Sequence, residues 1–146
     1  MVSGAMVNGD GGSGSPITIL LVEDEPPLLR LIQKYLQRMG FEVETHLKSV
    51  EALRDFEAAP DRYGMVIADL GMPEMRGDTL LTRMLEIRPD LRILVCSGSP
   101  FFIENLPGSL QRQVAFLQKP FVPKMLAEAV RNLLQDRSGS PPASNP

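Results

Sequence analysis

The chain has little of what several classes of protein require. Its 146 residues include one cysteine, one histidine and no tryptophan. A single cysteine, Cys96, excludes an internal disulfide framework and a cysteine-rich zinc site. No apolar run approaches the roughly 18 residues of a membrane-spanning helix. The chain has no cluster of basic residues of the kind that binds nucleic acid directly. No basic residue precedes Arg30, so the positively charged segment that begins a secretory signal is also lacking. We therefore expect a cytoplasmic protein with no membrane segment in this chain.

What is present is typical of one globular domain with unstructured ends. Hydrophobic residues make up 43% and charged residues 23% of the chain, and the net charge is −3. The segments 1–16 and 137–146 hold six of the 12 glycines and four of the 13 prolines, but almost no large apolar side chain. They cannot bury enough apolar surface to offset the entropy of ordering. We expect a flexible tail or linker at 1–16, a folded domain at 17–136 and a flexible tail at 137–146.

Between these ends, apolar runs alternate with segments of helical periodicity. Short apolar or alternating runs predict strands at 17–22, 41–45, 65–68, 92–96 and 114–118. Apolar residues at helical spacing predict helices at 26–39, from Ser49, from Asp78 and from Pro123, with Ser49 and Asp78 as N-caps and Gly40 as a C-terminal cap. This alternation predicts an α/β fold, a doubly wound five-stranded parallel sheet with helices on both faces.

Reactive side chains stand at the ends of four of these predicted strands. They are Glu23 and Asp24, Asp69, Ser97 and Lys119. In parallel sheets of this class the carboxyl ends of the strands form the edge at which ligands bind. Clustered carboxylates repel one another unless a cation intervenes, and an oxygen-only ligand set suits Mg²⁺. Carboxylates, a divalent ion and a lysine together favour phosphoryl transfer to an aspartate.

Four sequence strings give these residues a family resemblance. They are ILLVEDEP, ADLGMPEMRG, ILVCSGS and FLQKPF, and the second contains the pattern D-x-x-M-P-x-x-x-G. With them the chain resembles the receiver domain of two-component response regulators, the CheY-like family. The resemblance extends from Ile17 to about Leu134 and implies a flavodoxin-like sheet with strand order 2-1-3-4-5.

The resemblance also implies roles for individual residues. Asp69 matches the phosphoacceptor, Lys119 the lysine that neutralises charge beside it, and Ser97 and Phe116 the residues that switch conformation after phosphorylation. The implied ligands of Mg²⁺ are Glu23, Asp24, Asp69 and the backbone carbonyl of Gly71. Because the family often has the shorter Asp where Glu23 stands, Glu23 either touches the ion or acts through a water.

The family implies that the phosphodonor is a sensor histidine kinase or a phosphotransfer protein. LQKPF and the SG after the fourth strand look like receivers attached to hybrid sensor histidine kinases, so a free-standing domain and a domain of such a kinase both stay open. Two alternative functions are a receiver-like module that is not phosphorylated and a phosphatase with an aspartate nucleophile. The first predicts loss of Asp24, Asp69 or Lys119, and the second predicts an acid where Gly71 stands; neither is found.

Three further residues or segments carry expectations of their own. Cys96 is expected to be buried and inert, and His46 to lie on the surface. Pro107 and Gly108 should stop a fourth helix that begins near Phe101, so we expect that helix to be short or irregular with an exposed aromatic ring. The same face is then expected to support a monomer or a weak dimer.

Overall fold

The computed structural model describes residues 16–72, 75, 77–99, 104 and 106–135. Five strands form one sheet, in the order β2-β1-β3-β4-β5, and every neighbouring pair is parallel. The strands are β1 (Thr18–Val22), β2 (Glu42–His46), β3 (Met65–Asp69), β4 (Ile93–Ser97) and β5 (Val114–Gln118). This order confirms the predicted doubly wound fold.

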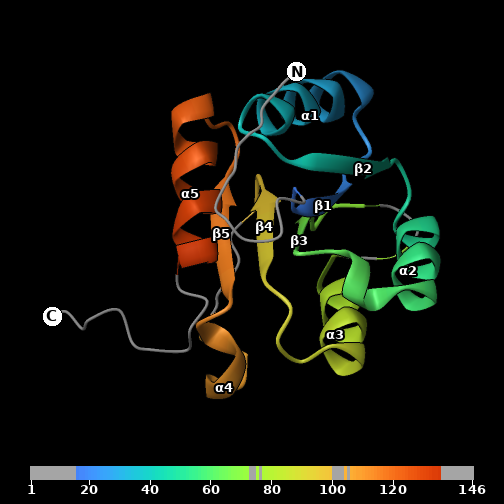
Figure 1. Ribbon diagram of the computed structural model, residues 1–146. Coiled ribbons are helices and arrows are strands. Elements are labelled where there is room, and N and C mark those ends of the chain that lie inside the picture. Colours follow the sequence, from blue (N-terminus) through green and yellow to red (C-terminus); the bar gives the residue numbers. More distant parts are fainter. Residues whose placement is uncertain (1–15, 73–74, 76, 100–103, 105, 136–146) are drawn as a thin grey trace, which may run out of the picture.

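The helices cover both faces of the sheet (Figure 1). They are α1 (Pro26–Arg38), α2 (Ser49–Ala58), α3 (Gly77–Ile87), α4 (Gly108–Gln111) and α5 (Pro123–Gln135), with a 3₁₀ turn, η2 (Pro60–Arg62), after α2. Ile19 and Leu21 of β1 pack with α1 and α5, whereas Leu20 and Val22 pack with α2 and α3. Successive side chains of a strand point to opposite faces, so a strand covered on both sides must be apolar throughout.

Burial falls from the centre of the sheet to its β2 edge. Every residue of β3 and β4 is buried, whereas every residue of β2 is half-buried or exposed. The β2 sequence, EVETH, accordingly has polar residues on the face that packs toward α2. Of the helices that the structure describes, none is both long and apolar enough to cross a membrane.

The predicted helix ends are correct at one position and wrong at two. Gly40 follows the C-cap of α1 with φ of 101°, the left-handed conformation that glycine adopts without strain. Ser49 is not the N-cap of α2: the cap is Lys48, and the buried Ser49 hydroxyl makes no hydrogen bond within the part of the chain that the structure describes. Asp78 is not an N-cap either, because α3 begins one residue earlier, at Gly77.

The region of the fourth helix differs from the expectation. Pro107 is the N-cap of α4 and Gly108 its first residue, so this pair starts a helix that the sequence did not predict. Proline is well suited to a helix start because its missing N–H would have no partner there. The helix that was expected to begin near Phe101 falls mostly outside the described residues. Phe101 and Phe102, and with them the expected exposed ring, lie outside the described residues, as do residues 1–15 and 136–146 of the expected flexible tails.

Candidate functional site

The carboxyl ends of the strands place the predicted site residues at one edge of the sheet. β1 ends at Val22, immediately before Glu23 and Asp24, while Asp69 and Ser97 are the last residues of β3 and β4. Because the strands are parallel and β3 lies between β1 and β4, these ends converge. Lys119 follows β5, and its backbone N–H donates to the carbonyl of Ser97 at 2.8 Å.

Lys119 joins two of the carboxylates. Its Nζ lies 2.9 Å from Glu23 Oε1 and 3.3 Å from Asp69 Oδ2. The Glu23 side chain is 1% exposed, and its second oxygen, Oε2, accepts the N–H of Glu25 at 3.2 Å. Asp69 is also buried, and its Oδ1 accepts the N–H of Gly71 at 3.2 Å. The lysine therefore holds the two buried acids in fixed positions.

Burial and charge act in opposite directions on this group. Burial is the largest effect on the pKa of Glu23 and raises it, Lys119 lowers it and the charge of Asp69 raises it, so that the pKa lies above its ordinary value. Burial alone would lower the pKa of Lys119, but its hydrogen bond and attraction to Glu23, with a smaller effect of Asp69, raise it above the ordinary value. Lys119 is therefore a firmly protonated cation beside the Asp69 carboxylate.

Three carboxylates of the site are close enough to share one ion. Glu23, Asp24 and Asp69 each offer an oxygen, and these oxygens lie within 4.8 Å of one another. Asp24 is half-buried and therefore reaches solvent, unlike its neighbour Glu23. An oxygen-only set with one open side fits a hard cation such as Mg²⁺, which keeps part of its water shell. The predicted contribution of the Gly71 carbonyl stays a prediction.

The two predicted switch residues lie beside this group on different strands. Ser97 is buried at the end of β4, where its Oγ accepts the N–H of Ser99 at 3.0 Å. Phe116 on β5 is half-buried, pairs in register with Val95, and packs against the core under α2 and α3. Their arrangement is compatible with a switch, and that role stays a prediction.

The two expectations outside the site have different outcomes. Cys96 is 1% exposed, which confirms that it is buried. Burial raises the pKa of its thiol to about 12, which disfavours the reactive thiolate, and its inertness stays a prediction. The expectation for His46 is wrong: its side chain is 15% exposed and its Nε2 lies 3.0 Å from Asp55 Oδ2. A second group of possible metal ligands, Glu44, His46 and Asp55, was thereby missed. The spacing of Glu44 and His46, two residues apart on a strand, was the available signal.

Comparisons with known proteins point to the same family. A model of the response regulator receiver domain matches residues 19–131. The sensor kinase CckA of Brucella abortus (strain 2308) is 38% identical over 125 residues, which is 84% of this chain and 13% of the kinase. The chain spans between 13% and 57% of the length of this and three other curated relatives.

Solved structures agree with this match. A CheY-like receiver domain protein from Methanospirillum hungatei JF-1 superimposes with a TM-score of 0.74 at 27% identity, covering 86% of this chain and 98% of that one. The response regulator TrrA from Thermotoga maritima, in complex with Mg²⁺-BeF, superimposes with a TM-score of 0.69 at 28% identity, covering 80% of this chain and 98% of that one.

Proposed function

The chain belongs to the family of response regulator receiver domains, and on this premise we propose that residues 17–136 form a phosphoacceptor domain in which Asp69 receives the phosphoryl group. The observation that carries the assignment is the 3.3 Å contact between Lys119 Nζ and Asp69 Oδ2 at the carboxyl edge of the sheet. It sets a positive charge beside Asp69, whose carboxylate also borders Glu23 and Asp24, the two acids that follow β1. A phosphoryl group transferred there would meet a preorganised cation.

The transfer breaks one bond and forms another. A carboxylate oxygen of Asp69 attacks the phosphorus of a phosphohistidine, and the P–N bond breaks. The electron pair stays on the donor imidazole, which takes up a proton, and Asp69 becomes an acyl phosphate. Lys119 holds its positive charge next to the phosphoryl oxygens, so it stabilises the charge that develops during the transfer.

We propose that Mg²⁺ belongs to this site. Asp24 and Asp69 would hold it, with Glu23 directly or through a water, because the oxygens of these three carboxylates lie together and Asp24 reaches solvent. The family resemblance adds the carbonyl of Gly71 as a further ligand. The bound ion would supply positive charge for the incoming phosphoryl oxygens. In its absence Lys119 is the cation that Glu23 and Asp69 share.

The acyl phosphate adds about two negative charges, and we propose that Ser97 and Phe116 respond to them. The Ser97 hydroxyl is bonded to a local amide and can turn toward a phosphoryl oxygen. Phe116 can then move into the vacated space, which shifts the population between two packings of the same fold.

The proposed phosphodonor is a histidine kinase or a phosphotransfer protein. The likeness to the sensor kinase CckA makes a hybrid kinase one possible parent of this domain. Among the alternative functions, a phosphatase lacks its second acid because position 71 is glycine, and an unphosphorylated module has no reason to retain Asp24, Asp69 and Lys119 together.

Replacing the proposed acceptor tests the proposal. Wild type, incubated with Mg²⁺ and a small acyl phosphate donor, should gain the mass of one phosphoryl group, and Asp69→Asn should gain none. The matched control is Asp90→Asn, which removes a carboxylate that is 82% exposed and pairs with Arg88 away from the site. Intact mass spectrometry measures both. Undiminished phosphorylation of Asp69→Asn would contradict the assignment.

A further inference from the structure

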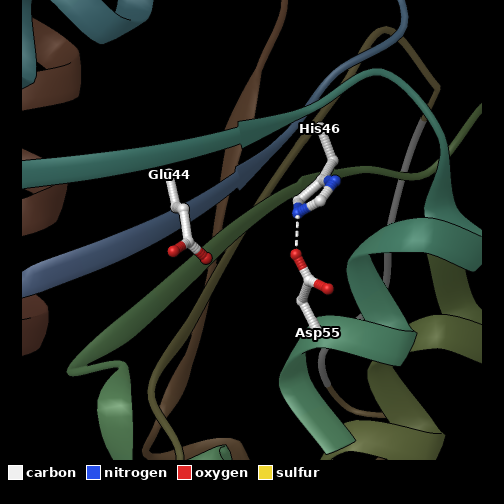
Figure 2. A group of neighbouring side chains, drawn as sticks. All are labelled: Glu44, His46 and Asp55. Carbon is white, nitrogen blue, oxygen red and sulfur yellow. Dashed lines mark ion pairs between the residues drawn. The ribbon is translucent and has the colours of Figure 1, made fainter. Parts of the chain in front are cut away.

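We infer that Glu44, His46 and Asp55 form a second cation site, separate from the proposed phosphoacceptor site and suited to Zn²⁺. Each residue offers one ligand atom, and these atoms lie within 4.8 Å of one another. Glu44 and His46 lie two residues apart on β2, so both point to the same face of the sheet. Asp55 reaches toward them from α2, and Figure 2 shows the three side chains converging from these two elements.

His46 is the residue that distinguishes this group from a surface ion pair. Its Nε2 lies 3.0 Å from Asp55 Oδ2, yet the atom is buried and makes no hydrogen bond with the described residues. A buried polar nitrogen without an aligned partner is an unfavourable arrangement in a folded protein. A metal ion between the imidazole and the carboxylates would use that nitrogen as a ligand.

Glu44 is already oriented for such a role. Its Oε1 accepts the hydroxyl of Tyr63, while its Oε2 pairs with Arg62. Tyr63 is buried and stacks on Phe56, so it holds the carboxylate in place, as outer partners of metal ligands do. The Arg62 side chain is 58% exposed and can leave Oε2 for solvent when a cation arrives.

The ligand chemistry favours Zn²⁺ over Mg²⁺ at this place. One imidazole and two carboxylates are ligands that Zn²⁺ accepts, whereas Mg²⁺ prefers oxygen alone. In a tetrahedral site with bonds of about 2.0–2.2 Å, ligand atoms are about 3.3–3.6 Å apart. The observed spread of up to 4.8 Å therefore needs only a small closure of side chains that are half-buried or exposed. The fourth position would hold water.

The imidazole itself reports on the site. His46 is the only histidine of the chain, so its ring nitrogens give one set of signals in long-range ¹H–¹⁵N NMR spectra. Zn²⁺ is added to the full chain in the presence of excess Mg²⁺, which occupies the oxygen-only site. We expect the Nε2 signal to shift and to saturate at one equivalent of Zn²⁺. Unchanged imidazole signals, or zinc binding by calorimetry that leaves them unmoved, would overturn the inference.

Two variants complete the test. Loss of an outer partner of a metal ligand weakens metal binding by about 10- to 100-fold, and Asp55→Asn, which removes a proposed ligand itself, should weaken Zn²⁺ binding by at least as much. The variant should still fold because the Asp55 side chain is 50% exposed. Glu51→Gln, which removes an exposed carboxylate of the same helix, should bind like wild type. By calorimetry, His46→Gln should lose this equivalent of Zn²⁺. Equal zinc binding in Asp55→Asn or His46→Gln would mean that the three residues only pin α2 to β2.

Discussion

Lys119 is shared unequally between two carboxylates. Its Nζ is closer to Glu23 than to Asp69, and Glu23 is the acid that is almost fully buried. Asp24 adds a third carboxylate beside Glu23 and Asp69, so the three acids and the single ammonium of Lys119 leave the group negative. An acid edge of this kind can take up a divalent ion and then a phosphoryl group. We therefore predict that an ionised Glu23 destabilises the folded protein when no metal ion is bound.

Glu23→Gln should reveal this penalty as a pH dependence. The pKa of Glu23 is raised above 4.5, so the folded state binds the proton more tightly than the unfolded state. The contribution of Glu23 to stability is therefore complete below pH 4.5 and is lost as the pH rises through the raised pKa. With chelator present, the unfolding free energy of Glu23→Gln should rise relative to wild type across this window. Urea denaturation at several pH values measures it.

The control for that series is Glu86→Gln, which removes an exposed carboxylate of α3. The raised pKa of Lys119 lies above 10.5, so its loss of charge does not enter the same window. A stability difference between Glu23→Gln and wild type that does not change with pH would contradict the burial account. So would the same trend in the control.

Single residues differ in how far the sequence could predict them. Asp69 and Lys119 could be brought together from sequence because both follow strands of one parallel sheet. Lys119 Nζ lies closer to Glu23 than to Asp69. This difference depends on the burial of the side chains, which cannot be read from a local sequence pattern. The pairing of His46 with Asp55 was missed because it joins a strand to a helix across a turn, where spacing alone does not fix which helical face meets the strand.

At the scale of elements, the helix ends depend on backbone conformation more than on residue type. Gly40 was predicted correctly because its φ of 101° is available to glycine at little energetic cost. Ser49 was wrong by one position and Asp78 by two, because α2 begins at Ser49 and α3 at Gly77. Local rules place helix ends only to within one or two residues. The sequence identified Pro107 and Gly108 as a helix boundary, but it did not show that a new helix, α4, begins there.

Gly40→Ala should destabilise the protein by about 1–2 kcal/mol. No atom lies within 4 Å of an added Cβ, so the loss comes from the left-handed backbone and not from a clash. Gly108→Ala is the matched control: its Cβ would also meet open space, and its φ is not left-handed. We expect the control to be neutral or to stabilise by about 0.4–1 kcal/mol. Equal effects of the two substitutions in thermal unfolding would contradict this explanation.

In the whole molecule, the residues that pack the core and the residues of the proposed site occupy different parts of the sheet. The two apolar clusters lie on its opposite faces, while the acids and Lys119 gather at the carboxyl edge. The fold and the strand order could be predicted because alternating apolar runs and right-handed crossovers leave few topologies. Binding at the edge can then stabilise the whole fold without a change in its core.

Mg²⁺ should therefore stabilise the unphosphorylated domain against unfolding. At about 100 times its dissociation constant, an ion that binds only the folded state adds about 2.7 kcal/mol. Asp24→Ala should remove most of this gain, because it takes away the proposed ligand that is half-buried and open to solvent. Thermal unfolding with and without Mg²⁺ measures the difference. An equal Mg²⁺ response in wild type and Asp24→Ala would exclude Asp24 as a ligand.

The most direct test of the central claim is to locate the phosphoryl group on the chain. Borohydride reduces an aspartyl phosphate to homoserine, which peptide mass spectrometry assigns to one position. After incubation of wild type with Mg²⁺ and an acyl phosphate donor, we expect this conversion at Asp69, the acid that Lys119 contacts at 3.3 Å. Conversion at Asp24 or at another acid, with Asp69 unmodified, would contradict the account.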